Sequence, residues 1–216
     1  MASSGDGFDT SAQSIGEWLQ LHVREVVIGS VVVIVAVAGV FFYRQVSVAN
    51  QRSSEQQYFA AQAQSGDPAA QQKALAQVVS SFEGTPSAAQ AAMLLAQLRF
   101  DDGKYDEGLA ALRRLEQGGV PDDFSAGVQA LIAAGLEGKH SFAEAAASYQ
   151  AAAKASRFDA DRQSYLADAA RAYRLAGNQA EAVKVWTDLA ADPANPLAAE
   201  ARVRLGELTA RPAARS

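Results

Sequence analysis

Few residues in this sequence have the types and spacing that chemistry requires. The chain contains two histidines, His22 and His140, which lie far apart in sequence and lack the spacing of metal ligands. It contains no cysteine, so a thiolate nucleophile, a Cys-ligated zinc site and a disulfide are excluded together. The sequence also has no phosphate-binding glycine loop, no nucleophile elbow and no zinc-binding helix motif. We expect no metal site and no cofactor.

Adjacent carboxylates are the pattern that comes nearest to acid–base chemistry. They occur at Asp101-Asp102 and again at Asp122-Asp123. Two carboxylates held together can act as general acid and base when their surroundings separate their pKa values. Both pairs fall beside predicted helix ends, where acidic side chains commonly face water, and nothing near them in sequence is expected to shift their pKa. We therefore predict solvated carboxylates and no enzymatic activity.

Charge and composition narrow the function classes further. The 216-residue chain has 19 Lys and Arg residues against 24 Asp and Glu residues, a net charge of −5. A surface of that sign is poorly suited to neutralising phosphates, so we expect no nucleic-acid partner. Beyond residue 57 the sequence is dominated by Ala with Leu, Gln, Glu, Lys and Arg, which favour helix at the lowest entropic cost. The composition predicts an all-α protein.

The first 25 residues divide into two segments. Residues 1–12 are small and polar, too poor in apolar surface to offset the entropy of ordering, and predict a disordered tail. Residues 13–25 predict a juxtamembrane amphipathic helix, because Ile15, Trp18, Leu19 and His22 share one face, whereas Glu17, Gln20 and Arg24 point elsewhere. The indole on that face is suited to the headgroup boundary of a bilayer.

Residues 26–43 predict a transmembrane helix. This uncharged run of roughly 18 residues is about the minimum that crosses a ~30 Å hydrocarbon core as a helix. A buried core helix is disfavoured because the run is apolar on every face and ends in an aromatic belt, Phe41 to Tyr43, followed by Arg44. We expect the bilayer to be contacted through residues 15–43.

Two features of this segment leave alternatives open. Residues 36–38 resemble a small-x-small cleavage site, but the long preceding segment with little positive charge and the continuation of the apolar run favour a retained anchor. Arg24 precedes the run, whereas Arg44 and Arg52 follow it. By one residue, the positive-inside rule therefore favours a cytoplasmic C-terminus.

An internal repeat with an offset of 37 residues organises the rest of the chain. Small or bulky residues recur at this spacing in three copies: Ala96, Ala133 and Ala170; Gly108, Ala145 and Ala182; Leu112, Tyr149 and Trp186; Leu115, Ala152 and Leu189. Small residues allow two helix axes to approach closely, and the bulky residue four positions on fills the groove between neighbouring hairpins. Each copy is therefore predicted to be a helical hairpin.

The repeat and the capping signals predict the domain organisation. Asp67-Pro68, Thr85-Pro86 and Asn195-Pro196 have the pattern of an N-cap followed by a first-turn proline, Pro121 is expected to open another helix, and a further helix is expected to start near residue 159. We predict a helical connector and an imperfect initial hairpin at 44–84, three hairpins at 85–194, and a capping helix with a tail at 195–216. The result is an α-solenoid behind an N-terminal transmembrane helix.

A solenoid offers a face lined by the first helix of each hairpin, where protein segments bind. The repeat register places these candidate protein-binding residues on that face: Gln90, Met93, Gln97, Phe100, Glu137, Ser164, Arg171 and Arg174. Met93 and Phe100 are equally compatible with the core. If exposed, they form an adaptable apolar patch that suits a protein segment better than a small molecule.

These hairpins resemble the tetratricopeptide repeat (TPR). Its turn glycine, aromatic and small-residue positions fall on Gly103, Tyr105 and Gly108 in the first copy, Phe142 and Ala145 in the second, and Tyr173, Gly177 and Ala182 in the third. The sequence departs from the family in three ways. The repeat is three residues longer than the usual ~34, Gln179 stands where an aromatic is expected, and Gly108 replaces Ala.

The whole layout, with the stretch SSFEGTPSAAQAAMLLAQLRFDDGKYDEGLAAL at 80–112, resembles the YfgM-type TPR proteins of the bacterial inner membrane. The resemblance implies a single-pass ancillary subunit of the SecYEG translocon, with a cytoplasmic N-terminus and a periplasmic repeat domain that links secretory clients to chaperones. The alternatives are a scaffold or assembly factor that bridges another integral membrane complex, and an adaptor that faces the cytoplasm. Repeat scaffolds serve many functions, so the partner is not named by the fold.

Overall fold

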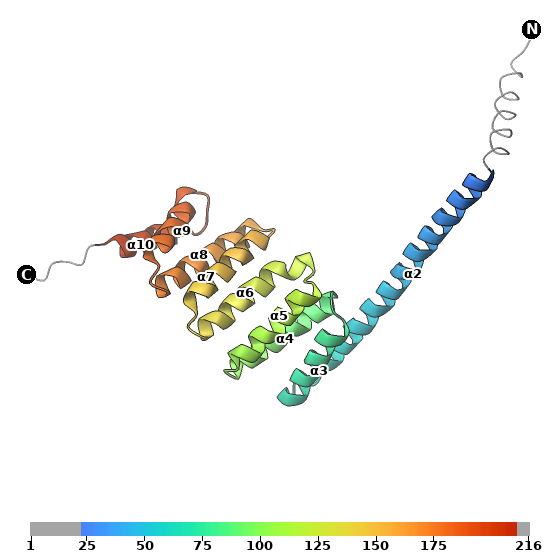
Figure 1. Ribbon diagram of the computed structural model, residues 1–216. Coiled ribbons are helices and arrows are strands. Elements are labelled where there is room, and N and C mark those ends of the chain that lie inside the picture. The colour runs from blue at the N-terminus through green and yellow to red at the C-terminus, as the bar shows by residue number, and fades with distance from the viewer. Residues whose placement is uncertain (1–22, 211–216) are drawn as a thin grey trace, which may run out of the picture. The chain divides into compact units, whose positions relative to one another are not determined.

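The structure, a computed structural model, describes residues 23–210. This part of the chain contains nine helices and no strand, which confirms the predicted all-α fold (Figure 1). The helices are α2 (Val23–Gln62), α3 (Pro68–Ser81), α4 (Pro86–Asp101), α5 (Tyr105–Gly118), α6 (Asp122–Gly138), α7 (Phe142–Ala155), α8 (Asp159–Leu175), α9 (Gln179–Ala191) and α10 (Ala198–Thr209). The predicted tail at 1–12, most of the predicted amphipathic helix at 13–25 and residues 211–216 lie outside the described residues.

The chain divides into two compact units between Asn50 and Gln51. In the first unit α2 is apolar and its described side chains are exposed, with Val35 65% and Phe42 72% accessible. The segment Val31–Gln62 of α2 contains an 18-residue window with a mean hydropathy of 2.0, none of it buried. By length and composition α2 is therefore able to span a membrane, and the helix extends to Gln62.

Two of the predicted helix starts in the second unit carry the expected caps. Asp67 accepts hydrogen bonds from the backbone amides of Ala69 and Ala70 at the start of α3. The Thr85 hydroxyl accepts one from the Ala88 amide, 3.2 Å away, at the start of α4. In both cases proline occupies the first turn, where its missing amide hydrogen costs nothing.

The prediction that Asn195-Pro196 caps a helix is wrong. Helix α10 begins at Ala198, two residues beyond that proline. The Asn195 side chain is buried, donates to the Leu189 carbonyl at 3.0 Å and accepts from the Leu197 amide at 2.8 Å. Asn195 therefore ties the loop after α9 back to that helix, and its amide group is used in a turn instead of a cap.

Helices of the second unit pack against their neighbours in chain order, and α4 also contacts α6 (Figure 1). We assign the repeats proposed at 85–194 to the pairs α4–α5, α6–α7 and α8–α9. All twelve positions that recur at an offset of 37 are buried, including Ala96, Ala133 and Ala170, each 0% exposed. The spacing of small and bulky residues in the sequence therefore marks the helix crossings.

The turns inside the three hairpins also follow the offset. Gly103, His140 and Gly177 are 37 residues apart, and they have φ angles of 74°, 60° and 78°. Each residue ends the first helix of its pair in the left-handed conformation that glycine adopts most readily. The second hairpin places a histidine there, and its ring lies edge-on to Phe142 with centroids 5.6 Å apart.

Two apolar clusters hold the second unit together. The larger runs from Ala61, in the last turns of α2, through α3 to α7, and includes Ala169 and Ala172 of α8. The smaller surrounds Trp186 and takes Ala167 and Ala170 from α8. Helix α8 therefore buries one face in each cluster, which its alanines allow because they leave both neighbours room to approach.

Candidate protein-interaction groove

The first helices of successive hairpins border a groove in the second unit. Its volume is about 460 Å³, and it is lined by Tyr58, Phe59, Gln62, Gln90, Met93, Leu94, Gln97 and Phe124, which we call the apolar groove. These residues come from the end of α2, from α4 and from the first turn of α6. None of the lining side chains carries a formal charge, so the surface suits uncharged segments of a partner.

The wall contributed by α2 follows from helical spacing. Ser54 and Ala61 are buried, whereas Phe59 and Gln62, on another face of the helix, are exposed. The Gln62 side-chain amide donates to the Tyr58 hydroxyl at 2.8 Å, and the Tyr58 and Phe59 rings lie 5.8 Å apart. Partial burial raises the pKa of Tyr58, so this hydroxyl remains a neutral hydrogen-bonding group.

Met93 joins this groove to the next stretch of surface. A Cβ atom placed at Gly127 would lie 3.1 Å from the Met93 methyl group, so α6 carries glycine where the thioether of α4 packs. Gly127 lines a second hollow of about 210 Å³ between α6 and the start of α8. The thioether is flexible and polarisable, which suits a surface that has to accommodate different apolar side chains.

The second hollow, which we call the acidic pocket, is lined mainly by Asp122, Asp123, Gly127, Arg157, Phe158, Asp161 and Tyr165. Arg157 pairs with Asp123 at 2.6 Å. Among the ion pairs of the described residues, neither Asp122 nor Asp161 takes part. Three carboxylates against one guanidinium leave the lining with a formal charge of −2.

Burial and nearby charges both affect the pKa of the tyrosine in this pocket. Burial raises the pKa of Tyr165, and the nearby carboxylates of Asp161 and Asp168 raise it further. The Phe158 side chain stands 65% exposed beside them, although it is one of the largest apolar residues of the unit. The pocket therefore places an exposed aromatic ring next to unpaired negative charge.

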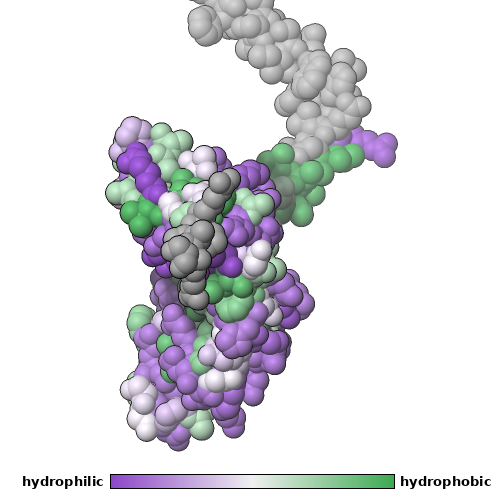
Figure 2. All heavy atoms as spheres, turned by 90° about the vertical axis from the view of Figure 1, so that its left-hand side faces the viewer, coloured by the Kyte–Doolittle hydropathy of each residue, from purple (hydrophilic) through white to green (hydrophobic). Residues whose placement is uncertain are grey.

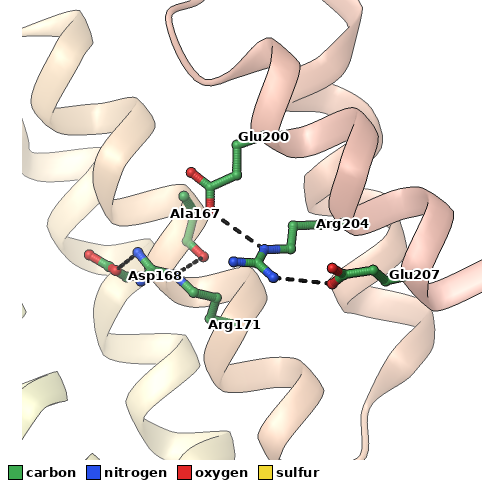
Figure 3. A network of polar contacts seen from close by, with 6 residues as sticks. All are labelled: Ala167, Asp168, Arg171, Glu200, Arg204 and Glu207. Atoms are coloured by element: carbon green, nitrogen blue, oxygen red, sulfur yellow. Dashed lines mark hydrogen bonds and ion pairs between the residues drawn. The ribbon is translucent and has the colours of Figure 1, made fainter.

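Helices α8 and α10 carry two groups of ion pairs (Figure 3). Arg171 pairs with Asp168 and also donates from Nε to the Ala167 carbonyl at 3.4 Å. Arg204 lies between Glu200 and Glu207, at 3.5 and 3.1 Å. Burial raises the pKa of Asp168 while Arg171 opposes the shift, and the hydrogen bond and charge of Glu207 raise the pKa of Arg204. Arg171 is thus engaged within its own helix.

The residues predicted for the interaction face separate into groups. Gln90, Met93 and Gln97 line the apolar groove. Ser164 and Arg174 are exposed on α8, as is Arg171, and none of the three lines the apolar groove or the acidic pocket. The structure therefore brings three of the eight predicted residues together in one groove.

Phe100 and Glu137 have partners inside the fold. Phe100 is partly buried against the larger cluster, and its ring stacks on Tyr105 with centroids 5.7 Å apart. Glu137 accepts a hydrogen bond from the Tyr149 hydroxyl at 3.1 Å. Burial and this carboxylate raise the pKa of Tyr149. Of the two readings open for Phe100, the structure favours the core.

The prediction that nothing shifts the pKa of the paired carboxylates is wrong for Asp102. A hydrogen bond from the Gln72 side chain at 3.1 Å, together with the Lys104 ammonium, lowers the pKa of this exposed carboxyl. Gln72 belongs to α3, thirty positions earlier in the chain, so the contact was invisible to local sequence patterns. It links two helix ends and holds the carboxylate in its ionised form.

Sequence reasoning missed Tyr58, Phe59 and Phe124, which complete the apolar groove. The signal available was the aromatic pair at 58–59 inside an otherwise polar stretch of α2. The face of the repeat helices seen in Figure 2 is largely hydrophilic with scattered apolar patches, whereas the visible part of α2 is mainly hydrophobic. Apolar side chains exposed in the groove are thus a minority feature of the repeat surface.

Consecutive antiparallel helix pairs with small residues at every crossing define the class of helical-hairpin solenoids. The chain belongs to the tetratricopeptide repeat-like domain family, whose model matches residues 17–188. A crystal structure from Podosopora anserina, assigned as a kinesin light chain with nearly identical TPR-like repeats, has a TM-score of 0.56 and 18% sequence identity. The match covers 74% of this chain and 86% of that one. At this identity the likeness establishes the fold. Among curated protein sequences, none matches this chain.

Proposed function

We propose that this TPR-like protein is a membrane-anchored interaction module that serves as an ancillary subunit of the SecYEG translocon. In this role it links secretory clients to periplasmic chaperones. TPR-like repeats are protein-interaction scaffolds, typically without catalytic activity of their own. The observation that carries the proposal is the apolar groove, with its exposed Phe59 and its partly buried Met93 set among uncharged side chains. Such a surface suits the apolar segments of proteins that have not yet folded.

The membrane side of the proposal rests on α2. Its exposed apolar run has the length and composition of a span, and its side chains from Val31 to Tyr43 are all solvent-accessible in the described chain. A helix that exposes apolar residues on every face is stable where the surrounding solvent is lipid.

The proposed orientation places the N-terminus in the cytoplasm and the repeat unit in the periplasm. It follows from the resemblance to YfgM-type proteins, and a one-arginine difference in flanking charge opposes it only weakly. The chain has no cysteine, so a single Gln97→Cys substitution offers a clean topology probe. A membrane-impermeant maleimide added to intact spheroplasts is expected to label it. Labelling only after lysis would place the repeat unit in the cytoplasm.

The partner is tested by photocrosslinking in living cells. A benzophenone amino acid at Gln97, inside the apolar groove, is expected to yield adducts with translocon subunits, secretory clients or chaperones, identified by mass spectrometry. The same residue at Lys184, exposed on α9 and not part of the groove, is the matched control and is expected to yield few adducts. Adducts with one unrelated membrane complex would replace the proposed role with that of a scaffold for that complex.

A further inference from the structure

The apolar groove and the acidic pocket are neighbours along α6. Helix α6 supplies Phe124 to the first and Asp122, Asp123 and Gly127 to the second, all within two turns. Met93, from the wall of the groove, packs against Gly127, from the wall of the pocket. A bound segment that follows the first helices of the repeats therefore passes from an uncharged apolar surface to a negatively charged one.

The apolar part of this surface has side chains available for contact. Phe59 is 64% exposed, and Met93, Leu94 and Phe124 are only partly covered by the core. Gln62, Gln90 and Gln97 surround them and can bond to the backbone of a bound segment without adding charge. The residues thus form an apolar centre with a polar neutral rim, the usual anatomy of a protein-binding site.

The charged part of the surface favours cations. Asp122 and Asp161 form no ion pair among the described residues, and Arg157 offsets one carboxylate of the three. The Phe158 ring next to them is exposed and therefore accessible to a cation, and a cation–π contact adds to carboxylate pairing. A guanidinium or ammonium group placed here gains both contacts, whereas an anionic side chain meets repulsion.

We infer that the apolar groove and the acidic pocket form one binding site for a protein segment that carries apolar side chains followed or preceded by basic ones. This inference rests on the proposed interaction role and adds the chemistry of the partner. The complementary charges fix where each part of the segment lies, because its apolar part meets α2 and α4 while its basic part meets the start of α8. Acidic segments and purely polar segments are excluded by the same two surfaces.

The test uses the full chain in nanodiscs of neutral phosphatidylcholine, with empty nanodiscs as the blank. The probe is a fluorescein-labelled peptide of twelve residues with three consecutive Leu or Phe residues next to three Arg or Lys residues in a Gly-Ser background. One comparison peptide has Glu at the basic positions, and another has Ser at the apolar positions. Fluorescence anisotropy is expected to show binding of the first peptide, weakened by salt, and at least tenfold weaker binding of the other two.

Two variants, one in the acidic pocket and one in the apolar groove, together with a matched control outside both, locate the peptide-binding site. Asp122→Asn with Asp161→Asn is expected to weaken binding by roughly five- to tenfold at low salt and to flatten the salt dependence. Phe59→Ala, at an exposed position where the fold is not at risk, is expected to weaken binding by about fivefold without changing the salt dependence. Glu144→Gln with Asp188→Asn removes two exposed acids outside the site and is expected to leave binding unchanged.

Three results would overturn the inference. Equal binding of the acidic peptide would show that charge does not select the ligand. Unchanged binding by both the acidic-pocket variant and the apolar-groove variant would show that the peptide binds elsewhere. A dimer in sedimentation that Phe59→Ala dissociates would show that a second copy of the chain occupies the groove. The inference and the proposed translocon role can fail separately. Selective peptide binding without translocon adducts at Gln97 would contradict the translocon role and still support this binding site.

Discussion

The first and second hairpins form equivalent helix crossings, but the first packs an aromatic ring where the second has a carboxylate. In α4–α5 the ring of Phe100 lies over Gly108, where an added Cβ atom would be 2.4 Å from that ring and 3.0 Å from the Ala96 carbonyl oxygen. In α6–α7 the equivalent residues are Glu137 and Ala145. The carboxylate bonds to the Tyr149 hydroxyl, and the space beside it accommodates the alanine methyl group.

This comparison explains a departure from the repeat pattern. Gly108 stands where the family has alanine because an aromatic side chain eight positions earlier has taken the volume of the methyl group. The same ring lies 2.4 Å from a Cβ built at Gly135, which belongs to the next hairpin. One large residue and two glycines therefore replace several small contacts, and close packing is kept.

The largest expected effect extends the comparison to the third hairpin. Trp186 is equivalent to Leu112 and Tyr149, but it is the centre of a small separate cluster. Trp186→Ala is expected to destabilise the chain by about 3–5 kcal/mol, because the cavity has few neighbours that can collapse into it. Urea unfolding in micelles, followed by far-UV circular dichroism, measures the change. A loss below ~1 kcal/mol would show that the smaller cluster is not needed.

The crossing itself is tested by Gly108→Ala. The added methyl group collides with the Phe100 ring, so the expected cost is about 1–3 kcal/mol. Adding Phe100→Ala removes the collision, and the double variant is then expected to lose less than the sum of the two single losses. Additive losses in a double-mutant cycle would show that the ring is not the reason for glycine.

A smaller effect is expected where the second hairpin uses a hydrogen bond. Tyr149→Phe leaves the ring in place but removes the donor to Glu137, and is expected to cost about 1 kcal/mol. The matched variant Glu137→Gln keeps an acceptor and is expected to cost less. Equal free energies of unfolding for wild type and Tyr149→Phe would show that the bond contributes nothing at this crossing.

One substitution in a hairpin turn is expected to stabilise the folded chain. His140 has the left-handed φ of 60° at the position where the other two hairpins have glycine. His140→Gly is expected to stabilise the chain by about 0.5–1 kcal/mol, since glycine adopts this conformation without the steric cost of a side chain. Gly103→Ala, the reverse change in the first hairpin, is expected to destabilise. A loss of stability in His140→Gly would instead show that the contact of the imidazole with Phe142 stabilises the turn by more than the left-handed conformation costs.

The smallest effect concerns pH. Because burial raises the pKa of Asp168 in the folded chain, its protonated form is favoured by folding. Its contribution to stability is therefore fully present below its ordinary pKa of 3.8 and is lost as the pH rises through the folded value. Relative to Asp168→Asn, the wild type is expected to gain stability on acidification from pH 7. The opposite slope would show that pairing with Arg171 outweighs burial.

The pKa of Asp102 is shifted in the opposite direction to that of Asp168. Its pKa is lowered by the Gln72 hydrogen bond and by Lys104, so its contribution is present above its ordinary pKa and is lost as the pH falls through the folded value. Asp102 lies in the turn after α4, whereas Asp168 lies within α8. The surroundings of the two carboxylates therefore shift their pKa values in opposite directions.

Much of the fold was readable in the sequence because the repeat is periodic. The 37-residue offset identified the buried alanines and the bulky residues of the second helices. The proline-based starts of α3 and α4 were predicted from capping chemistry. The start of α10 was not, because Asn195 is held by a carbonyl six residues earlier, a contact that depends on how the loop folds back.

The candidate site was only partly predictable. Gln90, Met93 and Gln97 follow from the helical register alone, as the exposed face of α4. Phe59 and Phe124 belong to segments that precede α4 by about thirty residues and follow it by about twenty, so their convergence on Met93 is a matter of packing between helices. Phe100 shares the register of the predicted face but turns into the core because two glycines leave room for its ring.

By itself, the sequence determined the all-α class, the apolar α2 helix and the hairpin repeat, since these depend on composition and on periods of a few residues or of one repeat. The tertiary structure alone decided which exposed side chains meet. It joined the end of α2 to α4 and α6 in one apolar groove and placed unpaired carboxylates beside it. The reason is physical: periodicity fixes which face of a helix is buried, whereas side chains from separate helices become neighbours only through packing.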